Sequence, residues 1–195
     1  MLNIPRPKFR ESQKTIIKRE NAYLDDEEIK TYLANVKTGI RKDTNSYKHK
    51  EWESRDMLIA QIFLNTGIRC SALYKLDINS IDFIKKTLIV TDKGGYTNEY
   101  VVSDGILDLA RIWLHDRSEK GVPKSENALF ISSRLKRMHV NSISNVVSKY
   151  AKGVKDIKFS PHKLRATYGT QLYDKTRDIY LVQQCMGHSS PKTSE

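Results

Sequence analysis

Apolar residues recur at helical spacing along most of this sequence, and one short segment breaks the pattern. The strongest run covers about residues 52–65, where apolar side chains would face a core and Gly67 would end the helix. Further helices are expected at about 25–36, 104–116, 140–152, 161–175 and 178–186. This distribution predicts a mainly α fold.

The exception lies between residues 81 and 102. Residues 81–91 are typical of two short strands around Lys85-Lys86, and residues 96–102 of a third strand. The turn Asp92-Lys93-Gly94-Gly95 joins the last two, because paired glycines accept positive φ. The expected fold class is therefore mainly α with a small antiparallel β-sheet.

Net charge, apolar runs and cysteine count indicate which binding partners and which cellular compartment to expect. The 195 residues carry 34 Lys and Arg against 23 Asp and Glu, a formal charge of +11, which favours a polyanion such as nucleic acid or an acidic membrane surface. No run approaches the roughly 18 apolar residues of a membrane span, and the first residues lack the apolar stretch of a secretory signal. Two cysteines cannot build a disulfide framework, so a reducing cytosol is expected.

Charge also suggests the domain organisation. Residues 1–20 contain Pro5, Pro7 and more basic than acidic side chains, which indicates a basic interdomain linker preceding a domain over 21–195. A second basic run spans residues 134–158, with seven Lys and Arg against Asp156. A solvated face is the ordinary explanation of such a run.

Four short motifs carry candidate chemistry, although each also has an ordinary structural explanation. Arg69 follows Gly67 at a corner between two expected helices, where a guanidinium can face a phosphate. Lys93 lies at the hairpin tip and could give a proton to a leaving oxygen. His188 follows Gly187 after the last expected helix.

The most specific of the four motifs is Ser160-Pro161-His162-Lys163-Leu164-Arg165. Serine followed by proline is typical of a helix start. His162 and Arg165 are then one turn apart in the first turns, where free N–H groups and the helix dipole favour an anion. The motif predicts a phosphate site with a proton carrier.

In this order, the four segments resemble the catalytic domain of the tyrosine recombinases, the phage-integrase family. The resemblance covers about residues 56–195, with an opening helix from Leu24. It implies the catalytic residues Arg69, Lys93, His162, Arg165 and His188. It further implies double-stranded DNA as partner, self-association into a tetramer on DNA in the full-length protein, and a bacterial cytoplasmic location at the nucleoid. A metal site is not expected, since Cys185 and His188 lack a second ligand pair. The resemblance also implies no cofactor, no membrane and no small-molecule substrate.

The sequence departs from the family in three places. The family's nucleophilic tyrosine would follow the final histidine by about nine positions, and none of the ten tyrosines follows His188. The C-terminal end with the nucleophile is therefore expected to be missing, and this chain to be inactive in strand cleavage. Ala72 stands where the family usually has an acidic residue, and Ala166 where many members have histidine.

The implied function is site-specific DNA recombination or integration through a phosphotyrosine. Three alternatives remain open at this point. The same basic residues could grip DNA in a non-catalytic binding module. A type IB topoisomerase would share the residue types. A hydrolase could use His162 and Lys93 without a tyrosine.

Overall fold

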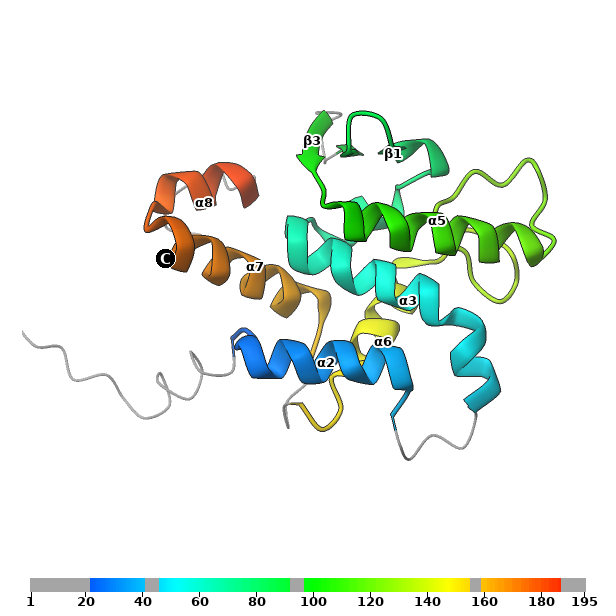
Figure 1. The fold of residues 1–195 in the computed structure, drawn as a ribbon, viewed down its shortest axis with the longest axis horizontal. Helices are drawn as coiled ribbons and strands as arrows, with labels where there is room; N and C mark the ends of the chain where they lie inside the picture. Colours follow the sequence, from blue (N-terminus) through cyan, green and yellow to red (C-terminus); the bar gives the residue numbers. More distant parts are fainter. Residues whose placement is uncertain (1–21, 41–45, 92–96, 155–158, 187–195) are drawn as a thin grey trace, which may run out of the picture.

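Helices packed around one long central helix form most of this protein, with a small sheet at one end (Figure 1). The computed structural model describes residues 22–40, 46–91, 97–154 and 159–186. The elements are α2 (Asp26–Thr38), α3 (Ser46–Thr66), α4 (Cys70–Tyr74), the 3-10 helix η1 (Ile78–Ser80), β1 (Ile81–Asp82), β2 (Thr87–Thr91), β3 (Thr97–Val101), α5 (Asp104–Glu119), α6 (Val140–Tyr150), α7 (Pro161–Thr176) and α8 (Ile179–Met186). The predicted fold class is confirmed.

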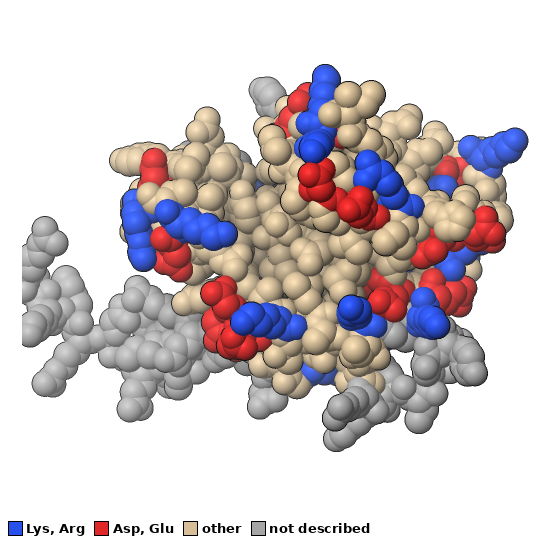
Figure 2. All heavy atoms as spheres, viewed as in Figure 1, with Lys and Arg blue, Asp and Glu red and all other residues tan. Residues whose placement is uncertain are grey.

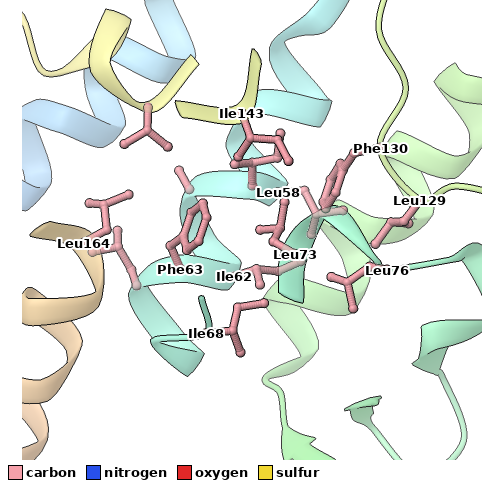
Figure 3. Packing of buried hydrophobic residues seen from close by; sticks show 14 of the residues in the cluster. Leu58, Ile62, Phe63, Ile68, Leu73, Leu76, Leu129, Phe130, Ile143 and Leu164 are labelled. Carbon is pink, nitrogen blue, oxygen red and sulfur yellow. The ribbon is translucent and has the colours of Figure 1, made fainter. Parts of the chain in front are cut away.

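The central helix is α3, which packs against α2, α5, α6 and α7. Its apolar side chains Leu58, Ile62 and Phe63 are fully buried, as the spacing predicted (Figure 3). Burying each such side chain contributes about 1.5–3 kcal/mol, so the buried face of α3 adds substantially to the stability of the domain. The helix begins at Ser46, earlier than the predicted start near residue 52. The prediction missed the first turns because they are polar and carry no apolar pattern.

The first described helix, α2, is fixed at its start by reciprocal hydrogen bonds. The Asp25 carboxylate accepts from the amide of Glu28 at 2.8 Å, and the Glu28 carboxylate accepts from the amide of Asp25 at 2.9 Å. This arrangement is a capping box, and it begins the helix where the sequence predicted one, at about residue 25. The amide of Leu24 donates to Thr167 Oγ1 at 2.9 Å and ties this start to α7.

The three strands form one antiparallel sheet in the order β1-β2-β3. Ile81 lies opposite Leu88, which in turn lies opposite Tyr100. Leu88 and Val90 face the core, whereas β3 is mostly exposed, so the sheet covers the helices with one face. The predicted turn with Lys93 lies outside the described residues.

The last two helices begin with different devices. Pro161 occupies the first turn of α7, as predicted, but the Ser160 side chain makes no capping hydrogen bond. Asp178 starts α8 by accepting from the amides of Tyr180 at 2.9 Å and Leu181 at 3.1 Å. None of the helices in the described ranges combines the length and apolar character needed to cross a bilayer.

Candidate active site at a junction of three chain segments

Arg165 connects three segments that are far apart in the sequence. Its side chain is 6% exposed, and its guanidinium donates to the carbonyl oxygens of Gly67 and Met186. The first carbonyl lies in the turn after α3 and the second at the end of α8. We call this contact of Gly67, Arg165 and Met186 the junction. It holds a permanent positive charge inside the protein, because a guanidinium does not lose its proton.

The turn at Gly67 needs glycine for two reasons. Its φ is +58°, a left-handed conformation that side chains disfavour. A Cβ there would also lie 2.3 Å from Cδ1 of Tyr168, well inside contact distance. The turn is closed by the Gly67 amide, which donates to the Phe63 carbonyl at 3.0 Å. The chain therefore leaves α3 at a fixed angle and reaches Arg69 two residues later.

Arg69 is the N-cap residue of α4, and its side chain is exposed. The backbone carbonyl two residues before it accepts from Arg165, so the segments that carry the two predicted arginines are bonded to each other. His162 is also exposed and lies one helical turn before Arg165 on α7. The fold thus places all three residues on two neighbouring segments. Lys93 and His188 lie outside the described residues.

Helix α8 approaches α7 closely at Gly169. A Cβ at this position would lie 2.6 Å from Met186 Sδ, so the absent side chain makes room for Met186. The same approach brings the Met186 carbonyl to Arg165. Met186 is two residues before His188 in the sequence.

Around Arg69, short helix α4 packs beside α6. The Cys70 thiol lies 3.8 Å from the carbonyl oxygen of Val140, and the rings of Tyr74 and His139 meet edge to face with centroids 6.3 Å apart. Burial raises the pKa of Cys70 to about 11, so the thiol stays protonated at neutral pH. Ala72 is buried in this contact and contributes no carboxylate beside Arg69.

The basic run from residue 134 includes one side chain with an internal role. Arg137 donates to the carbonyl oxygens of Tyr74 at 2.9 Å and Leu76 at 3.1 Å, and it pairs with the Asp77 carboxylate. It therefore secures the end of α4. Arg134 and Lys136 are exposed. The sequence showed only that these residues are basic.

The surface charge is mixed on the face seen in Figure 2. Acidic and basic side chains alternate around its edges, and its centre carries neither (Figure 2). The Lys and Arg side chains of the described residues therefore form no continuous basic patch on this face. In the described part of the chain, no three His, Cys, Asp or Glu side chains gather as a metal ion would require.

Sequence reasoning missed one contact within the junction and one beside it. It placed Arg165 on the phosphate-binding face but did not foresee that its side chain is buried against carbonyl groups. It also gave no indication that the ring of Tyr168 lies against Gly67, where it is partly buried. Neither contact has a local signal, since the partners come from distant segments.

Comparison with known proteins gives consistent matches. Tyrosine recombinase XerS of Streptococcus thermophilus (strain CNRZ 1066) is 31% identical over 186 residues, which are 91% of this chain and 51% of that protein. Tyrosine recombinase XerC of Alcanivorax borkumensis is 32% identical over 143 residues, which are 72% of this chain and 46% of that protein. The chain therefore spans about half the length of the curated relatives it matches.

Solved structures share the fold. The XerH site-specific recombinase bound to its difH substrate matches with a TM-score of 0.73 at 24% identity, covering 89% of this chain and 49% of that chain. The XerA recombinase matches with a TM-score of 0.72 at 22% identity, covering 88% and 58%. The family model described as "Phage integrase family" matches residues 22–195. Because that match covers most of the sequence, the chain belongs to the phage integrase family.

Proposed function

We propose that this chain is the catalytic domain of a DNA recombinase that acts through a covalent phosphotyrosine. The observation that carries the proposal is the junction, where buried Arg165 is bonded to the turn that presents Arg69. Arginines on two directly bonded segments suit a phosphodiester, whose non-bridging oxygens accept paired N–H donors from guanidinium groups. The relatives are tyrosine recombinases by name, and the XerH structure holds its DNA substrate.

In the proposed reaction, a tyrosine oxygen attacks a DNA phosphorus, forms a phosphotyrosine and releases the 5′-oxygen of the next nucleotide. The ester preserves the bond energy, so ligation needs no ATP. Arg69 and Arg165 would stabilise the negative charge of the pentacoordinate state. A well-placed arginine at a transferring phosphoryl group contributes roughly 10³–10⁵ in rate.

Three further residues would move or hold protons. Lys93 would protonate the departing 5′-oxygen, and His162 would assist proton transfer at the tyrosine. His188 would hydrogen-bond the phosphate. His162 is exposed in the first turn of α7, where free backbone N–H groups also favour an anion.

The proposal extends to organisation and partners. Residues 1–20 act as a basic linker, and residues 21–195 belong to the catalytic domain. Double-stranded DNA is the partner, and the full-length protein assembles as a tetramer on it. The location is the nucleoid of a bacterial cell.

A cleavage assay tests this function. No tyrosine follows His188, so we expect this chain to bind duplex DNA weakly without a covalent adduct on a denaturing gel. Supplying the missing nucleophile, by extending the chain with a tyrosine about nine positions after His188, should produce the adduct. Arg69→Ala in the extended chain should abolish the adduct and largely preserve DNA binding.

Other outcomes favour the alternatives. DNA binding with no adduct from the extended chain would indicate a non-catalytic module. Release of free cleaved DNA without a covalent species would indicate a hydrolase. Relaxation of supercoiled DNA without strand exchange between two sites would indicate a topoisomerase. Lys124→Ala, at an exposed position far along the chain from Arg69, is the control for a lost positive charge.

A further inference from the structure

Tyr168 contacts the same two segments that Arg165 connects. The two residues are i and i+3 on α7, so they lie on one side of the helix. Arg165 donates to the carbonyl groups of Gly67 and Met186. Tyr168 lies against Gly67 with its ring, and Cys185, the neighbour of Met186, is one of the groups that raise its pKa. Both side chains therefore span the space between the turn after α3 and the end of α8.

The ring contact is close and extends along one edge of the ring. A Cβ added to Gly67 would lie 2.3 Å from Cδ1, 3.0 Å from Cγ and 3.1 Å from Cε1 of Tyr168. The ring thus occupies the space where residue 67 would have a side chain. An aromatic ring is rigid, so the contact sets how closely the turn can approach α7.

Groups on α8 and β3 contribute to the pKa of the Tyr168 hydroxyl. Burial, together with Cys185 and Tyr100, raises the pKa of Tyr168 to about 12. The phenol is therefore neutral at pH 7 and available as a hydrogen-bond donor. Tyr100 belongs to β3, which follows the turn that contains Lys93 in the sequence. Tyr168 is consequently close to three of the segments that carry the proposed site.

We propose that Tyr168 is a positioning residue of the site, whose ring fixes the spacing between the Gly67 turn and the end of α8 and thereby keeps both carbonyl acceptors on Arg165. A guanidinium on a flexible stem does not set this spacing by itself, whereas a wedged ring does. Small displacements of a phosphate-binding group are costly, since about 1 Å can change a rate about 100-fold. The proposed role of Tyr168 in holding Arg165 does not depend on the proposed function. Only the statement that Arg165 binds a phosphate rests on that function.

The test compares Tyr168→Leu with Tyr168→Phe in the 195-residue chain. The NMR signal of the Arg165 Nε–H group, assigned with Arg165→Lys, reports how the guanidinium is held. We expect Tyr168→Leu to shift or broaden this signal and to weaken binding to a DNA duplex about 10-fold. Tyr168→Phe keeps the ring, so it should preserve the signal and bind within about twofold of the original chain.

Tyr173→Leu is the matched control, because Tyr173 lies on the same helix and is exposed. It should leave the Arg165 signal and DNA binding unchanged. A folded Tyr168→Leu protein with an unaltered Arg165 signal would overturn the proposal. If the leucine variant does not fold, Tyr168→His is measured instead, because histidine retains a smaller flat ring. We expect this variant to shift the Arg165 signal partially. An unaltered signal in Tyr168→His would also overturn the proposal.

The Arg165 signal is read without DNA, so it separates this proposal from the proposed function. If the original chain fails to bind duplex DNA at low salt while Tyr168→Leu still shifts the signal, the proposed function fails and the positioning role stands. If the original chain binds DNA and Tyr168→Leu changes neither measurement, the positioning role fails.

Discussion

At the scale of single residues, Gly67 is the position where a methyl group should do most harm. Gly67→Ala meets both an unfavourable φ and the Tyr168 ring at 2.3 Å, so we expect a loss of about 2–4 kcal/mol in the free energy of unfolding. Gly121→Ala is the control, because φ there is +70° with no atom within 4 Å of the added Cβ. It should cost only about 1 kcal/mol in a urea titration. Equal losses would show that the ring contact is loose.

Tyr168 also predicts a pH dependence. Its pKa in the folded protein is raised to about 12, chiefly by burial, above the ordinary value of 10.0. The folded state therefore favours the neutral phenol: this contribution is complete below pH 10 and is lost as the pH rises toward 12. Because water reaches the half-buried ring, we expect a loss of about 1–2 kcal/mol. Unfolding titrations of the original chain and Tyr168→Phe should diverge over this range; parallel curves would contradict the shift.

At the scale of elements, α8 depends on α7. Helix α8 has 8 residues, too few to be stable by itself in water, so its order comes from packing at Gly169. Gly169→Leu should push α8 away, cost about 1–3 kcal/mol and speed amide hydrogen exchange in α8. Exchange in α3 should become faster only as far as the loss of global stability requires. Gly105→Leu, where a Cβ would meet only Ser103 Oγ at 3.9 Å, is the control. Equal acceleration in α3 and α8 would contradict this dependence.

The elements also show what a sequence can predict. Apolar spacing located α5, α6 and the extent of α2, because this signal is local. The start of α3 was missed, since its first turns are polar. The packing of α8 on α7 and the burial of Arg165 arise from contacts between segments, for which neighbouring letters carry no signal.

At the scale of the whole molecule, the basic linker and the domain should be separable. The contacts that start α2 come from Leu24, Asp25 and Thr167, so a chain of residues 21–195 keeps them. We expect its melting temperature to stay within about 2 °C of the full chain, because the core is untouched. Residues 1–20 hold six Lys and Arg, and their loss should weaken DNA binding.

Salt dependence measures that loss directly. Each phosphate neutralised by a basic side chain steepens the fall of log K with log salt by about 0.9 for duplex DNA. If residues 1–20 contact DNA, removing them should make the slope shallower by up to about 5, whereas Arg69→Ala should change it by about 1. Both slopes are read from binding titrations between about 50 and 200 mM salt. An unchanged slope after truncation would place the DNA contacts within residues 21–195. If the affinity of the original chain for DNA did not depend on salt, the proposed phosphate site would lose its electrostatic basis.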